Sequence, residues 1–219
     1  MAPVGTRRLT RYDKGMAKEG KARRDTILDE ATRLFAERGY EGASMADLAE
    51  RVGLRKASLF HHFASKDELR AAVLNRLVQE VGGAIAVAAV AEGSFEERLD
   101  TLSNAITLVL CQQPFAARLL VREAMEWGPE ATSETAQAIA GVLEGAAEFL
   151  RAGQEAGVFQ QLDARQAVVS ALGMHFMPFA IAGVVERFTN LRPFEPACAE
   201  ERGAAVRAHV RSMLLAPKR

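Results

Sequence analysis

Cationic and polar side chains cluster between positions 55 and 62, and they are the residues best suited to chemistry with another molecule. The cluster comprises Arg55, Lys56, Ser58, His61 and His62. Helical spacing places Leu54, Leu59 and Phe63 on the opposite, apolar side of this segment. Arg and Lys near the start of a helix can donate hydrogen bonds to guanine O6 and N7 in a major groove. The segment is therefore predicted to be a DNA-reading helix.

The residues around this segment predict a helix-turn-helix between Ser44 and Leu69. Ser44 can cap a first short helix, on which Leu48 and Val52 share one apolar face. Gly53 stands where the chain must reverse, because glycine adopts left-handed backbone without steric cost. An ordinary helical hairpin is the alternative interpretation of this stretch.

Composition favours an all-α fold for this chain of 219 residues, because good helix formers dominate and only 7 residues are proline. The net charge of zero hides an asymmetry. Residues 1–66 carry 14 Lys and Arg against 9 Asp and Glu, whereas the remainder carries 14 against 19. The positive end coincides with the predicted helix-turn-helix, as a phosphate-binding surface requires.

Three segments are expected along the chain. Residues 1–21 are predicted to be a disordered basic arm, which either keeps the protein in solution or contacts DNA. Residues 22–66 form the helix-turn-helix domain, with a first helix over about 22–38 that ends at Gly39. Residues 67–219 form a helical ligand-binding and dimerisation domain. The expected fold is thus a three-helix domain plus a C-terminal bundle, about nine helices in all, in a dimer.

Two expected helices, over 163–188 and 197–215, are apolar on more than one face. Pairing with the same helices of a second subunit would bury these faces in a symmetric four-helix interface. Burial within one subunit is the alternative. A kink is expected at Pro178, because proline has no N–H to donate within the helix.

A run of 20 uncharged residues lies between Arg165 and Glu186. This run is long enough to form a membrane-spanning helix. Polar residues dilute it and its flanks carry no basic asymmetry, so a buried helix is the preferred interpretation and no membrane partner is expected. Cys111 and Cys198 are too few for a disulfide framework. The N-terminus lacks an apolar signal core, so a cytoplasmic location is expected.

The N-terminal third resembles the TetR family of bacterial repressors. Arg24 to Tyr40 is similar to the family's first helix and its Gly-Tyr end. Ser44 to Leu69 is similar to its helix-turn-helix and the start of its fourth helix, including Leu-Phe-His-His-Phe and Ser-Lys-Asp-Glu. The match covers about 22–70 and is specific as a combination. Beyond it, only the length and the order of helices agree with the family.

The resemblance implies a homodimer and assigns residues to the DNA interface. It implies base contacts from Arg55, Lys56 and Ser58, and phosphate contacts from Lys66 and from His61 or His62; Ser44 and Arg24 complete the predicted DNA-binding set. Two positions depart from the family pattern. Ala57 stands where a glycine is frequent, and Phe60 where a phosphate-binding tyrosine is common. Phe60 has no hydroxyl to donate, so we expect it to pack within the domain.

The resemblance also places a ligand pocket among the C-terminal helices. The candidate lining residues are Asn104, Thr107, Cys111, Arg122, Glu123, Trp127, Met174, His175, Phe176 and Phe179. An apolar, elongated ligand suits this set. The alternative is that the Phe and Met residues are ordinary core and that His175 is a buried histidine with satisfied hydrogen bonds.

Together these features predict a repressor that a small, largely apolar effector releases from double-stranded operator DNA. The alternative is a ligand-independent regulator that works through protein contacts, and an open space of a few hundred Å³ in the bundle would favour the effector. The sequence has no phosphate loop, nucleophile elbow or metal-spaced cluster. No enzymatic activity, cofactor or metal is therefore expected.

Overall fold

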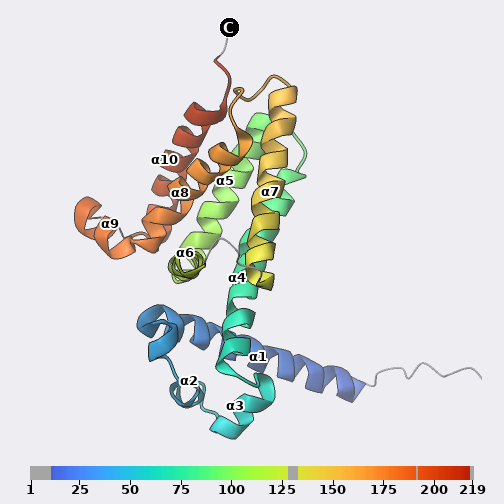
Figure 1. Cartoon of the computed structure of the whole chain (residues 1–219), viewed down its shortest axis with the longest axis vertical. Helices are drawn as coiled ribbons and strands as arrows, with labels where there is room; N and C mark the ends of the chain where they lie inside the picture. Colours follow the sequence, from blue (N-terminus) through green and yellow to red (C-terminus); the bar gives the residue numbers. More distant parts are fainter. Residues whose placement is uncertain (1–10, 128–132, 191, 218–219) are drawn as a thin grey trace, which may run out of the picture. The chain divides into compact units, whose positions relative to one another are not determined.

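The computed structural model describes residues 11–127, 133–190 and 192–217. In these residues the chain forms ten α-helices and no strand, which confirms the all-α fold (Figure 1). The helices are α1 (Arg11–Gly42), α2 (Met45–Arg51), α3 (Lys56–His62), α4 (Lys66–Ala89), α5 (Phe95–Gln112), α6 (Ala116–Glu126), α7 (Glu134–Glu155), α8 (Ala164–Ala180), α9 (Ala182–Thr189) and α10 (Pro196–Leu214). They divide into two compact units between Val73 and Leu74, within α4.

The first unit contains α1, α2, α3 and the start of α4. Its core consists of fully buried side chains from each helix: Ile27, Leu34, Leu48, Leu59, Phe63, Leu69 and Val73. Ser44 caps α2, since its hydroxyl accepts a hydrogen bond from the Asp47 N–H at 3.1 Å. Gly53 adopts a φ of 64° between α2 and α3, the left-handed conformation that the predicted turn requires. The helix-turn-helix therefore forms where the sequence places it.

The basic segment before this unit differs from the prediction. Helix α1 begins at Arg11 rather than near Ala22, so the part of the expected disordered arm from Arg11 to Lys21 is helical. Residues 1–10 lie outside the described residues. Extending an established helix costs far less than starting one, and residues 11–21 contain no proline to prevent extension. The predicted end of the first helix is correct in position, because the backbone at Gly39 is non-helical.

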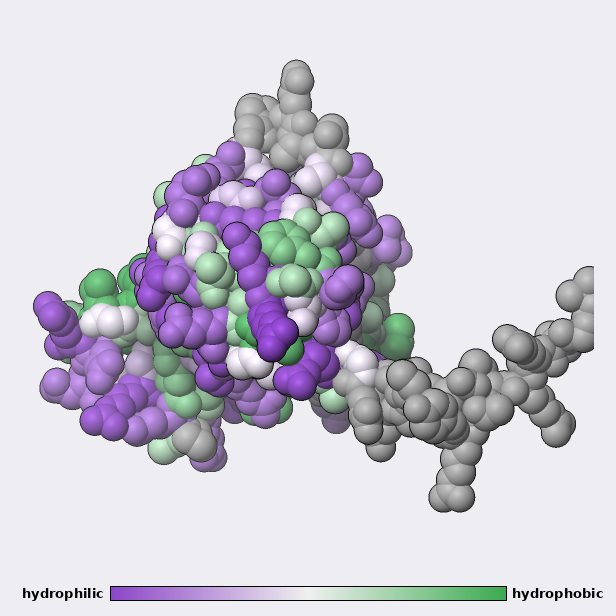
Figure 2. Space-filling model, turned by 90° about the horizontal axis from the view of Figure 1, so that it is seen from below, coloured by the Kyte–Doolittle hydropathy of each residue, from purple (hydrophilic) through white to green (hydrophobic). Residues whose placement is uncertain are grey.

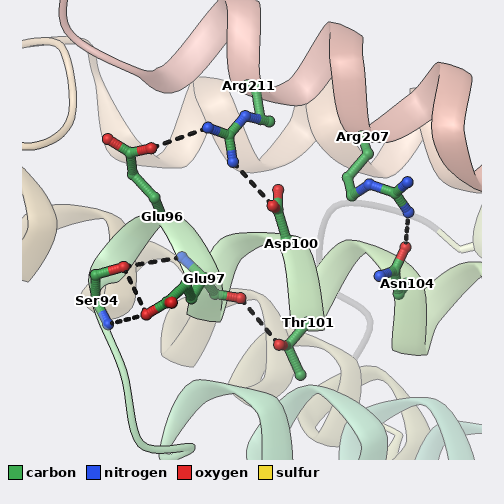
Figure 3. Close-up of polar contacts among 8 residues, drawn as sticks. All are labelled: Ser94, Glu96, Glu97, Asp100, Thr101, Asn104, Arg207 and Arg211. Atoms are coloured by element: carbon green, nitrogen blue, oxygen red, sulfur yellow. Dashed lines mark hydrogen bonds and ion pairs between the residues drawn. The ribbon is translucent and has the colours of Figure 1, made fainter.

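The second unit is a bundle in which α8 contacts α5, α6, α7 and α10, and α10 packs along α5 (Figure 1). Its aromatic centre joins Phe95, Phe149 and Phe159, whose ring centroids lie 5.7–5.8 Å apart. Polar contacts join α5 to α10 at the edge of this core (Figure 3). There the Arg211 guanidinium bonds both Glu96 and Asp100, at 2.9 and 2.8 Å.

The long apolar helix predicted over 163–188 is broken at Ile181 into α8 and α9, which meet at a bend of 80°. The prediction of one kinked helix is therefore wrong, and the tenth helix arises from this break. Pro178 cannot donate to the Met174 carbonyl one turn earlier. Arg202 on α10 donates to that carbonyl instead, at 3.0 Å. Among the described residues no single helix is long and apolar enough to cross a membrane; only α8 and α9 taken together pass that test.

Gly153 in α7 is a point of close contact. A Cβ there would collide with the ring of Phe159, and the Gly153 carbonyl accepts hydrogen bonds from the N–H groups of Val158 and Phe159. Gly145 lies on the same helix with no atom close to where its Cβ would be. The two glycines therefore offer a matched test of the packing at this end of the bundle.

Replacing Gly153 by alanine is expected to lower the free energy of unfolding by about 1–3 kcal/mol, because the new methyl group displaces Phe159. Gly145→Ala should instead raise it by up to about 1 kcal/mol, since alanine is the better helix former. Urea unfolding followed by circular dichroism measures both values. A Gly153→Ala variant as stable as Gly145→Ala would contradict this account of the contact.

Candidate functional site

Five of the eight predicted DNA-binding residues lie on α3 or directly before it. Arg55 precedes α3 in an extended conformation, and Arg55, Lys56 and His61 are exposed, whereas Ser58 and His62 are half-buried. Leu59 and Phe63 point into the core and are fully buried. The structure thus brings the predicted cluster together on one helix. Hydrophilic residues predominate on the face of the molecule seen in Figure 2.

The charges of α2 are arranged differently from those of α3. Arg51 bonds Glu37 at 2.7 Å, and Arg38 bonds Asp47 at 3.0 Å, so these cations are paired within the unit. Within the described part of the chain, neither Arg55 nor Lys56 forms an ion pair. Their charges are therefore available to an anionic partner.

Phe60 does not pack within the domain as expected. Its side chain is 40% exposed, and the Lys56 ammonium lies 6.0 Å from the centre of its ring. Leu59 and Phe63 already fill the core side of this helix, which leaves Phe60 outward. The ring and the ammonium group one turn before it attract each other, because the face of an aromatic ring is electron-rich.

Tyr40 contacts the start of α4, and it is not among the predicted DNA-binding residues. Its ring lies beneath the Lys66 ammonium, at 4.2 Å, and the Arg70 guanidinium, at 4.5 Å. The Tyr40 hydroxyl donates to the Asp67 carboxylate. Burial, with help from that hydrogen bond, raises the pKa of Tyr40 to about 12, so the hydroxyl stays protonated. Tyr40 therefore holds Lys66 at the start of α4.

Arg24 connects α1 to the end of α3. Its guanidinium donates to the His62 carbonyl at 3.1 Å and lies 4.2 Å from the centre of the Phe63 ring. Ser44 is placed at the start of α2, where its hydroxyl is already used as a cap. Both predicted DNA contacts therefore lie in the first unit and also have structural partners there.

Two apolar cavities, of about 80 and 130 Å³, lie inside the second unit, and two larger, more open and more polar hollows, of about 510 and 530 Å³, lie on it. The first lies among α4, α5, α7, α8 and α10, and the second among α4, α6, α7 and α8. Five residues line both cavities: Ile85, Val142, Leu143, Leu172 and Phe176. The cavities therefore adjoin, although each is smaller than the few hundred Å³ expected for a ligand site.

Only some of the predicted ligand residues lie at these cavities. His175 lines the first and Phe176 lines both. The others lie outside both cavities: Asn104, Thr107, Cys111, Arg122, Glu123, Trp127, Met174 and Phe179. Of these, Asn104 and Thr107 line the hollow of about 530 Å³, and Phe179 lines the hollow of about 510 Å³. Asn104 instead accepts from Arg207 between α5 and α10, as Figure 3 shows. Trp127 donates to Glu123 at 3.2 Å.

Most cavity-lining residues have apolar side chains that the sequence does not distinguish from ordinary core. The exceptions are Ser103 and His175, which lie 3.0 Å apart. Burial lowers the pKa of His175, which keeps the imidazole neutral near pH 7. Ser103 follows Leu102 and precedes Asn104 on α5, and only its burial, unknown from sequence, could have identified it.

Each of the two units matches a known family of protein domains. Residues 27–73 match the family described as bacterial regulatory proteins, tetR family, and residues 92–177 match the tetracyclin repressor-like C-terminal domain. A stretch of 46 residues, 21% of this chain, is 46% identical to the biofilm operon icaADBC HTH-type negative transcriptional regulator IcaR of Staphylococcus aureus. The chain thus matches about a quarter (25%) of the length of that curated relative.

Solved structures agree over most of the chain. The TetR family transcriptional regulator PfmR of Thermus thermophilus is 29% identical, with a TM-score of 0.69 over 84% of this chain and 96% of PfmR. AibR, in complex with isovaleryl coenzyme A and operator DNA, is 20% identical, with a TM-score of 0.71 over 86% of this chain and 97% of AibR. At that identity the likeness to AibR concerns the fold alone. From its helix-turn-helix, its helical second unit and these matches, the chain belongs to the TetR family of bacterial regulatory proteins.

Proposed function

We propose that this protein is a DNA-binding transcriptional repressor that dissociates from its operator when an apolar small molecule binds its second unit. The observation that carries the DNA-binding part is that Arg55 and Lys56, at the start of α3, are exposed and form no ion pair with any described residue, while Leu59 fixes the helix in the core. The name of IcaR describes a negative regulator, which supports repression as the direction of control.

The chemistry of each side chain suggests its role on DNA. Arg55 and Lys56 can donate to guanine O6 and N7, each good pair being worth about 1–3 kcal/mol of discrimination. Lys66, held over Tyr40 at the start of α4, can bind a phosphate together with the free N–H groups of the helix N-terminus. Ser58 and His61 lie on the same helix, α3, and can donate a hydrogen bond to a base edge or to a phosphate oxygen.

A homodimer would present two such helices to successive major grooves about 34–36 Å apart. Exposed apolar side chains on α8 and α9 support a subunit interface there: Val169, Met177, Ile181, Val184 and Phe188. The apolar side chains of helix α10, by contrast, are buried in the core of its own unit: Val206, Val210 and Leu214. The observed exposure thus supports α8 and α9 as the main pairing elements.

Each apolar cavity is smaller than the few hundred Å³ of a typical ligand site, and the support for an effector is that the two adjoin and share five lining residues. Helices α4, α7 and α8 contribute to the walls of both cavities, and α4 continues into the first unit. An effector can weaken DNA binding only by its greater affinity for a conformer that fits DNA poorly. AibR, whose fold this chain shares, has been solved with isovaleryl coenzyme A and operator DNA together.

Replacing Arg55 and Lys56 together by alanine is expected to lower selective DNA affinity at least thirtyfold, because the two contacts are jointly worth about 2–6 kcal/mol. Fluorescence anisotropy with a fragment selected by the full-length protein, and with a scrambled fragment, measures the selectivity. The control Arg122→Ala with Arg165→Ala removes the same charge from the second unit and should retain it. Undiminished selectivity in the Arg55, Lys56 variant would refute the proposed interface.

The effector hypothesis predicts that Leu172→Phe resists release from DNA, because Leu172 lines both cavities and the larger ring fills their boundary. Apolar compounds that release DNA from the wild type are expected to need at least about tenfold higher concentration with this variant. Leu108→Phe makes the same change at an exposed position of α5 and should respond normally. The effector proposal fails when no compound of a diverse apolar library releases DNA, or when both variants respond like the wild type.

A further inference from the structure

The first cavity contains one polar feature in an otherwise apolar wall. Of its lining residues, only Ser103 on α5 and His175 on α8 have polar side chains, and none is charged. Ser103 is 2% exposed and His175 4% exposed. Their side chains meet across the cavity wall, with 3.0 Å between Ser103 Oγ and His175 Nε2. Among the lining side chains, this pair is therefore the only hydrogen-bond partner for a polar group of a molecule bound in the first cavity.

The position of the hydrogens follows from the second partner of the imidazole. His175 Nδ1 lies 2.8 Å from the Ala171 carbonyl oxygen, which can only accept a hydrogen bond. Nδ1 therefore carries a hydrogen. Burial keeps the ring neutral, so Nε2 has a lone pair and accepts the hydroxyl hydrogen of Ser103.

This arrangement leaves the cavity with an acceptor and no free donor. The Ser103 hydroxyl uses its hydrogen on His175 but keeps lone pairs on Oγ. A ligand that only accepts would have to take that hydrogen and leave His175 Nε2 buried without a partner, which costs about 1–3 kcal/mol. A ligand hydroxyl or N–H can bond to Oγ and leave the pair intact.

A charged ligand group fits the cavity poorly. Arg202 is the cation whose charge disfavours protonation of His175, and it lines neither cavity. Its guanidinium donates to the Met174 carbonyl at 3.0 Å, on the helix backbone. A carboxylate placed beside Ser103 would therefore lose its hydration without gaining a lining cation.

We propose that the effector is a neutral, apolar molecule with one hydrogen-bond donor, a hydroxyl or N–H, that binds to Ser103 Oγ in the first cavity. This inference rests on the proposed effector site and specifies its chemistry. The apolar part of the molecule extends past Leu143, Leu172 and Phe176 into the second cavity. A cavity of about 150 Å³ holds benzene, so the two adjoining volumes suit a ring or chain of roughly six to ten carbons.

Three probes with eight-carbon formulas or chains test this chemistry on the full-length wild-type protein: 1-octanol, its isomer heptyl methyl ether, and octanoate. Calorimetric titration at pH 7.5 measures each affinity. We expect 1-octanol to bind at least about tenfold more tightly than either of the others, because only the alcohol donates without a charge. Equal affinity for the alcohol and the ether, tighter binding of octanoate, or no binding of any probe would overturn the inference.

Ser103→Ala alone would leave His175 Nε2 as a new acceptor for the alcohol, so the test variant combines Ser103→Ala with His175→Phe and removes both acceptors. It should lower the ratio of the 1-octanol affinity to the ether affinity at least about tenfold, because neither lining side chain can then accept from the alcohol. Thr101→Ala is the matched control, since Thr101 is an exposed hydroxyl residue of the same helix. Its preference for the alcohol should equal that of the wild type. If the double variant does not fold, the ratio of the 1-octanol affinity to the heptyl methyl ether affinity in the wild type decides the question.

Release of DNA is measured separately with the same probes. Preferential binding of the alcohol without any release from DNA contradicts the proposed effector function and leaves the inferred cavity chemistry standing. Release by the ether as effective as release by the alcohol supports the effector function and overturns the donor requirement. The two failures are therefore distinguishable.

Discussion

The burial of Leu59 and Phe63 is the interaction on which the proposed DNA-facing surface depends. Helix α3 has 7 residues, and isolated helices of that length do not form in water. It exists because these two side chains are fully buried against the rest of the unit, and because Gly53 turns the chain into it with a φ of 64°. Arg24 holds the far end of α3 through the His62 carbonyl. The core thus decides which side chains of α3 face outward.

In the second unit, apolar packing is tight in one place and leaves cavities in another. Its helices pack tightly at the Phe95, Phe149 and Phe159 cluster but leave two cavities beside α4. Well-packed interiors contain few voids larger than a water molecule, so adjoining apolar volumes are costly unless a ligand occupies them. Ser103 and His175 add a polar pair there, although an apolar pair would pack without the cost of desolvation.

Local signals made much of the first unit predictable. Ser44, Gly53 and the apolar spacing of α2 and α3 act within a few residues, so the sequence indicates the helix-turn-helix directly. Features that depend on distant contacts were not predictable. The break at Ile181 is accompanied by a bond from Arg202 on another helix, and the exposure of Phe60 depends on how the core is filled. The cavity walls are mostly aliphatic residues whose spacing is that of any core helix.

Methylation interference tests the central claim, that the start of α3 reads a major groove, most directly. Guanine N7 lies in the major groove and adenine N3 in the minor groove. For full-length protein on its selected operator, we predict that N7 methylation blocks binding at two positions about one helical turn apart. Interference confined to adenine N3, or none at guanine N7, would contradict this assignment of α3.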